Sequence, residues 1–362
     1  MTQLLTHEGE PRSGEPQSGE PQSGEPQLGE PQPGGLTLAA ARFFAARMAG
    51  SWVPGYLAGR GFGEEALRPW TVGYAPAGWH VLADCLRDLG YPDTAIQAAG
   101  LARRTRRGVL VDFFRDRAMF GIRWPDGTVA GFTGRARPGV GRPGAGQPGP
   151  VYLNSRTTAL FRKGSLLFGL YEGRRALAAG ARPVLAEGPL DAIAVSAAGR
   201  YAGVSPCGTA LTPAQVTLLA RTADLRRAGV VVAFDADRAG RRAAARAYHL
   251  LHDVTGRADT LVLPAGQDPA GFRREHGGRA LARRLDACVP LADLVVDEAL
   301  APFERGLVFL DGKFAALHAA APLVAGLPSG QVARQVARLA GRLGLAYAEV
   351  TEAVTSALRP GG

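Results

Sequence analysis

Three stretches of the chain decide its fold: PVLAEGPLDAIAV (residues 183–195), GVVVAFDADRAG (229–240) and DTLVLPAGQDPAG (259–271). In each of them a short apolar run is followed by acidic residues. The apolar runs at 184–186, 230–234 and 260–263 predict short, fully buried strands, and helix-length segments lie between them. Strands that alternate with helices form a parallel sheet covered by helices, so we predict an α/β centre for this chain.

Acidic side chains follow each of the predicted strands. They are Glu187 and Asp191 after the first, Asp235 and Asp237 after the second, and Asp268 after the third. The carboxyl ends of parallel strands meet at one edge of a sheet, where ligands of such folds bind. Carboxylates that converge repel one another and stay ionised only beside cations, and Mg²⁺ or Mn²⁺ prefers such oxygen ligands. The spacing therefore predicts a metal-dependent phosphoryl-transfer centre, with Glu187, Asp235, Asp237 and Asp268 as metal ligands.

Helix capping is the alternative role for these acids. A lone Glu-Gly or a lone Asp-x-Asp is more often structural than catalytic, and Asp191 alone can partner the dipole of its own helix. Three acidic clusters in order, each after a strand, favour the metal site. Such a site would hold nucleotide phosphates and activate an attacking hydroxyl, and Glu187 would also be placed to shuttle protons.

The composition is that of a folded, soluble protein without disulfides. The chain has 362 residues, 46% of them apolar, which suffices for two or three folded domains. Its three cysteines, Cys85, Cys207 and Cys288, show no CxxC spacing, so we expect reduced thiols and neither disulfides nor zinc. The sequence has no apolar run of membrane-spanning length and no signal-peptide core. We therefore expect a soluble, cytoplasmic protein without membrane contact.

Positive charge is concentrated outside the amino-terminal segment. The net charge is +10, but the first 35 residues carry six glutamates and one arginine, so the remainder carries about +15. A basic body favours a polyanionic partner such as nucleic acid, although a GC-rich genome also produces an arginine bias. Two arginine clusters either contact phosphate or stay hydrated: ARRTRR at 102–107, and Arg334, Arg338 and Arg342 at four-residue spacing.

Breaks in the pattern divide the chain into four parts. Residues 9–32 repeat a GEPQS unit that cannot bury a core, so we predict a disordered tail at 1–35. Thr37 is expected to cap a helix through residues 39–50, and two strands are expected around the Asp126-Gly127 turn. The remaining parts are a mixed α/β region at 36–171, the parallel-sheet region at 172–285 and a helical region at 286–362, which makes the chain α+β overall.

The acidic stretches resemble the Toprim domain that bacterial primases, type IA and type II topoisomerases and some nucleases share. The glutamate motif, the DxD motif and the DP loop stand in the order of that family. The resemblance narrows to the catalytic core of DnaG-type primases and extends over residues 36–358. It is carried by YLAGRGF (56–62), DFFRDRAMFGI (112–122), GFTGRA (131–136) and VYLNSRTTALFRKGSLLFGLYEG (151–173). It implies a mixed amino-terminal primase subdomain, a central Toprim sheet flanked by helices and a helical carboxyl-terminal subdomain.

The resemblance also implies roles for particular residues. Glu187, Asp191, Asp235, Asp237 and Asp268 fall on catalytic and metal-binding positions. The polar and basic face that holds template and incoming nucleotides would consist of Arg117, Arg135, Asn154 and Lys163. Arginine suits this task because it can grip a phosphate with two hydrogen bonds. For Arg117, a surface salt bridge with Asp112 or Asp116 is the alternative.

Departures from the family pattern concern the metal site and the partners. The DPD loop reads Asp268-Pro269-Ala270, so one acidic ligand is missing, and Val151 replaces the lysine expected before YLNS. Neither a zinc-binding module nor a helicase-docking domain is recognised. We therefore expect a DNA primase-like nucleotidyltransferase that makes short RNA primers from ribonucleoside triphosphates on single-stranded DNA during replication. It would use a zinc-ribbon protein or the replicative helicase in trans.

Two other functions use the same residues. A Toprim nuclease would direct water at the phosphodiester, but the YLNS to GLYE segment speaks against that class. A degenerate core that binds nucleic acid without catalysis would account for Ala270, Val151 and the missing module.

Overall fold

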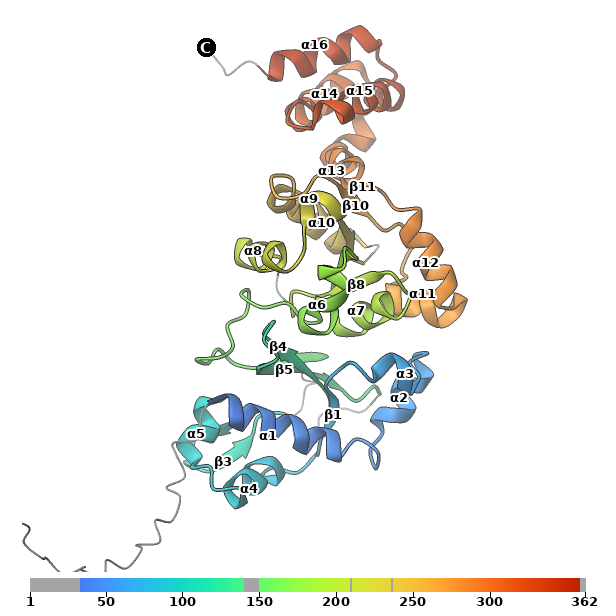
Figure 1. Ribbon diagram of the computed structural model, residues 1–362. Helices are drawn as coiled ribbons and strands as arrows, with labels where there is room; N and C mark the ends of the chain where they lie inside the picture. The colour runs from blue at the N-terminus through green and yellow to red at the C-terminus, as the bar shows by residue number, and fades with distance from the viewer. Residues whose placement is uncertain (1–32, 140–149, 209, 236, 359–362) are drawn as a thin grey trace, which may run out of the picture. The chain divides into compact units, whose positions relative to one another are not determined.

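A parallel sheet lies at the centre of the chain, as the sequence predicts (Figure 1). The computed structural model describes residues 33–139, 150–208, 210–235 and 237–358. The predicted repeat tail falls outside the described residues, except for its last three positions. Residues 32–362 belong to one compact unit by their contacts.

The central sheet has five strands in the order β11-β10-β9-β7-β8. The neighbours β8, β7, β9 and β10 run parallel, and β11 is an antiparallel edge strand. Their bounds are β7 Arg182–Ala186, β8 Tyr201–Val204, β9 Val230–Ala233, β10 Ala258–Thr260 and β11 Val289–Pro290. Sequential strands are joined through helices, so the predicted alternation of strand and helix is confirmed.

Both faces of this sheet are buried under helices. Val184 and Val231 pack into one apolar cluster, whereas the adjacent Leu185 and Val232 pack into another. Successive side chains of a strand point to opposite faces, so only a sheet covered on both sides makes such a run wholly apolar. The helices are α6 Leu170–Ala178, α7 Pro189–Ser196, α8 Pro213–Thr222, α9 Leu225–Ala228, α10 Arg238–Leu251, α11 Pro269–His276 and α12 Gly278–Asp286.

The third strand of the acidic pattern begins and ends earlier than the sequence predicts. We expected residues 260–263, but β10 ends at Thr260. Leu261 still donates its N–H to the Val232 carbonyl at 2.9 Å, whereas the Val262 side chain is 52% exposed. The apolar run therefore continues past the sheet into the loop that carries Asp268, and hydropathy alone misplaces its end.

A second, antiparallel sheet precedes the central one. Its strand order is β1-β4-β5-β6, and a separate two-stranded hairpin pairs β2 with β3. The bounds are β1 Val72–Ala75, β2 Ala102–Arg104, β3 Leu110–Asp112, β4 Arg117–Arg123, β5 Val129–Ala136 and β6 Tyr152–Asn154. The predicted turn at Asp126-Gly127 joins β4 to β5 and is confirmed: Gly127 has a φ of 98° and donates to the Trp124 carbonyl.

Helix α1 (Pro33–Ala46) begins before the predicted cap. Thr37 therefore lies inside the helix, and the prediction that it is the amino-terminal cap is wrong. Its hydroxyl instead donates to the Val129 carbonyl of β5 at 2.6 Å, in a position that is 2% exposed. A threonine hydroxyl serves a buried carbonyl as readily as a helix end, so the residue type alone does not distinguish the two. The other helices of this part are α2 Val53–Gly59, α3 Glu64–Leu67, α4 Val81–Asp88 and α5 Asp93–Ala98.

One apolar cluster joins the antiparallel sheet to the parallel one. It includes Val53, Phe120 of β4, Val184 of β7 and Leu285 of α12. Within it the rings of Trp70 and Phe168 stack with centroids 4.9 Å apart. The two sheets thus share buried side chains across the boundary predicted at residues 171/172, and that boundary stays a prediction.

The carboxyl-terminal part is helical, as predicted. It consists of α13 Leu291–Leu300, the 3₁₀ helix η1 Ala301–Gly306, α14 Leu310–Ala325, α15 Ser329–Leu343 and α16 Tyr347–Ala357. Among the described residues, no helix combines the length and the apolar character that crossing a membrane requires.

The regularly spaced arginines of α15 form ion pairs inside the protein. Arg334 contacts Asp293 at 2.5 Å, Arg338 contacts Asp297 at 2.5 Å, and Arg342 contacts both Asp297 and Glu304. We call these six residues the α13–α15 ladder. Carboxylates of the protein itself neutralise these three arginines, so their charges need neither a phosphate backbone nor water alone.

Candidate active site

The three predicted acidic clusters lie at the carboxyl ends of neighbouring strands. Glu187 follows β7 directly, and its Oε1 accepts a hydrogen bond of 3.1 Å from the backbone N–H of Asp235, just beyond β9. The backbone carbonyl of Glu187 accepts a bond of 2.8 Å from the Ser205 hydroxyl, just after β8. Side chain and main chain thus connect three adjacent strand ends at one edge of the sheet, which is the arrangement that the sequence predicts.

Asp237 and Asp268 each cap a helix with one carboxylate oxygen. Oδ1 of Asp237 accepts from the Gly240 N–H at 2.7 Å, and Oδ1 of Asp268 accepts from the Gly271 N–H at 2.5 Å. A carboxylate has two oxygens, so capping leaves Oδ2 of each residue for a ligand. The capping role and the ligand role are therefore compatible in this geometry.

Gly240 fixes the position of the Asp235 loop. A Cβ built at Gly240 would lie 2.1 Å from the Asp235 carbonyl oxygen, far inside contact distance. Only glycine lets the first turn of α10 approach the loop that closely. The sequence expectation that Gly240 allows close packing of this helix is confirmed.

Asp191 is the most buried of the five acids. Its side chain is 8% exposed, and its Oδ1 accepts from the Ala270 N–H at 3.1 Å. Burial, with the charges of Asp268 and Asp235, raises the pKa of Asp191 to about 7. The contact joins the first turn of α7 to the first turn of α11, so Asp191 supports the loop of Asp268 and is itself almost shielded from solvent.

The carboxylates at this edge repel one another. Burial and the charges of Glu187, Asp268 and Asp237 raise the pKa of Asp235 to about 6. Neighbouring carboxylates raise a pKa only when they are close and have no compensating cations. The charges of Glu187, Asp268 and Asp237 thus act on Asp235 from neighbouring strand ends.

The carboxylates fit a hard divalent cation by chemistry. Four acidic side chains offer oxygen ligands, which Mg²⁺ and Mn²⁺ prefer. In the described part of the chain, no group of three or more histidine, cysteine, aspartate or glutamate side chains is already close enough to hold an ion. The assignment of Glu187, Asp235, Asp237 and Asp268 as metal ligands therefore stays a prediction.

Basic and aromatic side chains of the antiparallel sheet face the acids. The Arg135 guanidinium of β5 lies 4.7 Å from the Tyr56 ring centroid and 5.7 Å from that of Tyr152. Burial and the charge of Asp191 are among the causes that raise the pKa of Tyr152, because the phenol of β6 lies near that carboxylate. Arg135 is thus placed beside the acidic edge, as the resemblance implies.

Arg60 is a residue that our sequence reasoning did not single out. Burial alone would lower its pKa, but Tyr56 and the negative charge of Asp268 raise it above its ordinary value. Its Nε is buried and has no hydrogen-bond partner. The next residue, Gly61, has a φ of 82° and its carbonyl accepts from Arg273 of α11 at 2.5 Å. The signal was present in YLAGRGF, where two glycines flank the arginine.

Arg117 and Asn154 support the chain around the site. Arg117 is 4% exposed and donates to the carbonyls of Gly134, Pro150 and Val151, which ties the start of β6 to β5. Asn154 donates to the Cys207 carbonyl at 2.7 Å, and its Oδ1 is buried with no hydrogen-bond partner. These contacts position Tyr152 and the loop after β8, and the nucleotide-binding role of both residues stays a prediction.

Lys163 lies in an exposed loop and approaches Cys207. Its positive charge opposes the rise that burial causes in the pKa of the Cys207 thiol. Asn154 and Lys163 therefore converge on the same loop after β8, whereas Arg117 lies behind β6. The nucleotide-binding role of all four predicted polar residues stays a prediction.

Two family models match the chain. Residues 45–174 match the amino-terminal domain of the DNA primase catalytic core, and residues 184–272 match a Toprim-like domain. The DNA primase of Streptomyces coelicolor is 33% identical over 292 residues, which cover 80% of this chain and 44% of that protein. The DNA primase of Synechococcus elongatus is 38% identical over 274 residues, or 74% of this chain and 38% of that protein. The chain thus spans less than half the length of these relatives.

Solved structures agree with these matches. The RNA polymerase domain of Mycobacterium tuberculosis primase DnaG superposes with a TM-score of 0.74 at 30% identity, covering 85% of this chain and 98% of that one. A DNA primase domain from Pseudomonas aeruginosa gives a TM-score of 0.70 at 31% identity and covers 88% and 98%. Both structures are covered almost completely, so the shared part is the catalytic core. The chain belongs to the family of DnaG-type primases.

Proposed function

We propose that this protein synthesises short RNA primers on single-stranded DNA as a DNA-directed nucleotidyltransferase. The observation that carries the proposal is the opposition of two surfaces: carboxylates at the strand ends, and Arg60 and Arg135 with two tyrosines across from them. A polymerising site needs both, because a triphosphate and a template are polyanions that must reach an acidic, metal-dependent centre. Related catalytic domains have been crystallised with single-stranded and double-stranded DNA.

In this proposal Glu187, Asp235, Asp237 and Asp268 hold the metal. Toprim primases as a family are generally metal-dependent, and we assign Mg²⁺ or Mn²⁺ to the site. The bound ion supplies Lewis-acid stabilisation of charge on the transferred phosphate. Oε1 of Glu187 is occupied by the Asp235 N–H, so its Oε2 is the oxygen that takes up the proton of the attacking hydroxyl.

The residues across from the acids bind the substrates. Arg60 and Arg135 neutralise the triphosphate, since a guanidinium donates two parallel hydrogen bonds to a phosphate. The rings of Tyr56 and Tyr152 offer faces on which a base can stack, with Arg135 beside both. Asn154 of β6 and Lys163 of the loop after β6 orient the template beside the loop after β8. A zinc-ribbon protein or the replicative helicase acts in trans, and the reaction takes place in the cytoplasm.

Primer synthesis by the purified protein tests this assignment. The protein is incubated with single-stranded DNA, labelled ribonucleotides and Mg²⁺ or Mn²⁺, in parallel with Glu187→Gln and with Glu352→Gln, a matched change at an exposed glutamate of α16. We expect RNA products from the parent and from Glu352→Gln, and a loss of about 100-fold or more in Glu187→Gln.

Other outcomes identify the other functions. Cleavage of the template that depends on Glu187 would indicate a nuclease. DNA binding without products, also after addition of a zinc-ribbon protein, would indicate a non-catalytic core and would contradict the proposal.

A further inference from the structure

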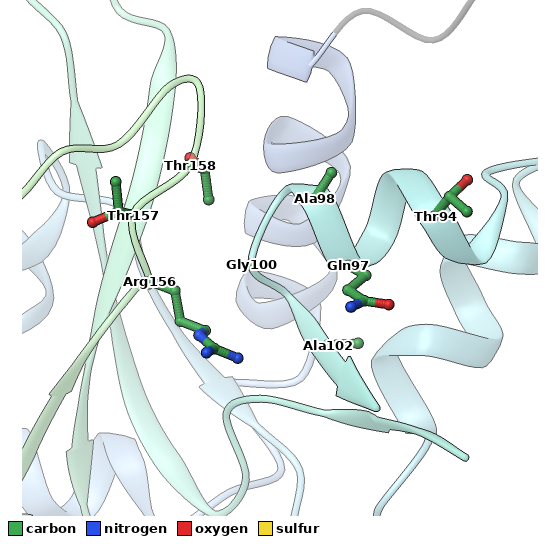
Figure 2. Close-up of a pocket in the computed structure, with 8 residues that line it drawn as sticks. All are labelled: Thr94, Gln97, Ala98, Gly100, Ala102, Arg156, Thr157 and Thr158. Carbon is green, nitrogen blue, oxygen red and sulfur yellow. The ribbon is translucent and has the colours of Figure 1, made fainter. Parts of the chain in front are cut away.

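A second pocket lies outside the acidic site. It has a volume of about 580 Å³ and opens between α5 and the loop that follows β6 (Figure 2). This volume is in the range of small-molecule sites and is large enough for a nucleotide. None of the residues that line it belongs to the acidic edge or to the face of Arg60 and Arg135.

The lining of this pocket suits an anion. Its polar lining residues are Thr94, Gln97, Arg156, Thr157 and Thr158, and none of the residues that line it is a carboxylate. The guanidinium of Arg156 and the amide of Gln97 face each other across the gap, whereas the hydroxyls of Thr94 and Thr157 point away from it (Figure 2). Guanidinium and amide groups donate hydrogen bonds, and a site with such donors and without carboxylates selects negative charge. A cation has no anionic ligand among these side chains.

Arg156 is available to such a ligand. Its side chain is exposed and extends from the loop into the gap toward α5 (Figure 2). Among the described residues, it takes part in no hydrogen bond or ion pair. By contrast, Arg104 of β2 donates to the Gly108 carbonyl and contacts Asp93. An arginine that the protein does not pair, at the wall of a donor-lined pocket, has its full charge to offer to a bound group.

The loop that carries Arg156 is held in place by a close approach at Gly100. Gly100 has a φ of 71°, and a Cβ there would lie 3.1 Å from Cγ2 of Thr158 and 3.8 Å from Cβ of Arg156. The Thr158 hydroxyl accepts from the N–H groups of Leu160 and Phe161, so its own proton remains free to donate. These contacts fix the backbone of the loop that carries Arg156 before any ligand arrives.

Small residues leave one side of the pocket flat. Ala98, Gly100 and Ala102 line it and carry at most a methyl group. A flat, weakly apolar surface beside a phosphate-binding guanidinium matches the two halves of a nucleotide, whose planar base or sugar adjoins a charged phosphate. Ala102 also begins the β2–β3 hairpin, whose exposed Arg106 and Arg107 add positive potential nearby.

We propose that this pocket binds the phosphate of a nucleotide unit, with the guanidinium of Arg156 as its main anchor and the amide of Gln97 on the facing wall as a second donor. Two sources share this chemistry: a free nucleotide and a nucleotide within a single strand. The site operates without a divalent metal, because it has no ligand for one. The proposal goes beyond primer synthesis and does not depend on the acidic edge.

Binding in EDTA tests the proposal, because chelation removes the metal-dependent part of the binding at the acidic site. The part of that binding that needs no metal is common to the parent and the pocket variants, so their difference reports on the pocket. The probes are ATP and a twelve-residue oligothymidylate, titrated into the full-length protein by calorimetry. Arg156→Ala should weaken binding about tenfold or more, since it removes a charge-assisted contact. Arg162→Ala, an exposed arginine of the same loop that does not line the pocket, is the matched control and should bind as the parent does.

A second variant distinguishes binding of the probes in the pocket from their general electrostatic attraction to a basic protein. Ala98→Trp places an indole at the exposed wall of the pocket and leaves every charge in place, so it should block binding as strongly as Arg156→Ala.

Each outcome decides the proposal. Loss of ATP binding in both pocket variants supports a free nucleotide, and loss for the oligonucleotide alone supports a strand. Equal affinity of the parent, Arg156→Ala and Ala98→Trp for both probes, or no binding by the parent, would overturn it.

Discussion

Two clusters of carboxylates in this protein have opposite electrostatics. In the α13–α15 ladder, burial alone would raise the pKa of Asp293, but hydrogen bonds from Arg334 and Gln335 bring it below its ordinary value. At the acidic edge, burial and neighbouring carboxylates raise the pKa of Asp235 to about 6 and that of Asp191 to about 7. Arginines neutralise the carboxylates of the ladder, whereas the carboxylates of the acidic edge repel one another.

The two clusters show what distinguishes a structural group of acids from a functional one. Both clusters contain several acids on adjacent elements, so composition does not distinguish them. What differs is the supply of cations: the ladder contains three arginines, whereas the acidic edge keeps Arg60 at its margin. An acidic cluster that the protein itself does not neutralise is the one prepared for a cation from outside.

The largest effect is expected at the acidic edge. Asp235→Asn removes a carboxylate that three neighbouring acids already repel, so we expect primer synthesis to fall about 100-fold or more while the metal-free protein becomes more stable. Product assays with Mg²⁺ and thermal unfolding in EDTA measure the two quantities. A variant that loses both activity and stability would show that Asp235 is structural, and would remove the contrast with the ladder.

The same change of charge should have the opposite sign in the ladder. Asp293 accepts from Arg334 and from Gln335, whose side chain is fully buried. Asp293→Asn should therefore lower the free energy of unfolding by about 1–3 kcal/mol, because the buried amide of Gln335 loses a charged acceptor, while solvent screens the pair with the more exposed Arg334. Chemical denaturation of the parent and the variant provides this measurement.

Arg342→Ala serves as the milder control in the ladder. Its side chain is 33% exposed, so solvent screens its ion pairs and the cost should be below about 1 kcal/mol. If Asp293→Asn were as harmless as Arg342→Ala, the ladder would have to be regarded as a set of surface contacts.

A pH series sharpens the comparison further. An aspartate of the unfolded chain loses its proton near pH 4, whereas folded Asp191 keeps its proton up to about pH 7. The folded state binds more protons in between, so this group's contribution to stability falls as the pH rises from about 4 to about 7. We expect Asp191→Asn, which still accepts from the Ala270 N–H, to lack that fall.

Unfolding temperatures of the two proteins in EDTA give the test. The difference between Asp191→Asn and the parent should grow by a few degrees up to pH 7 and stay constant above it. Parallel curves across this range would mean that Asp191 ionises normally and that the edge is less strained than the contacts indicate.

The sequence predicts the central sheet and its acidic edge because both depend on local patterns. Continuous apolar runs mark strands buried on both faces, and strand polarity alone places Glu187, Asp235 and Asp268 at one edge. The close approach at Gly240 could also be predicted, since a glycine in the first turn of a helix commonly allows that helix to pack closely on a neighbouring loop. Each of these inferences needs only residues close together in the chain.

Long-range contacts are what the sequence does not reveal. Thr37 donates a hydrogen bond to β5 across 92 positions, and the ladder pairs residues that lie 38–45 positions apart. Arg60 lies near the acidic edge because the adjacent Gly61 packs against α11. The sequence around Arg60 has no periodicity that would predict this contact. Arg117 looks like a surface cation in sequence, yet it is buried among carbonyls.

Helix α13 belongs to two cores at once. Leu291 packs with α10 and the central sheet, whereas Ala292, Val296 and Leu300 pack with the last three helices. A fragment cut just before this helix would keep the acidic edge but would expose the apolar flank of α10 to water, which favours aggregation. A fragment cut just after α13 would instead expose Ala292, Val296 and Leu300, so the helical part and the parallel-sheet part are best expressed as one piece.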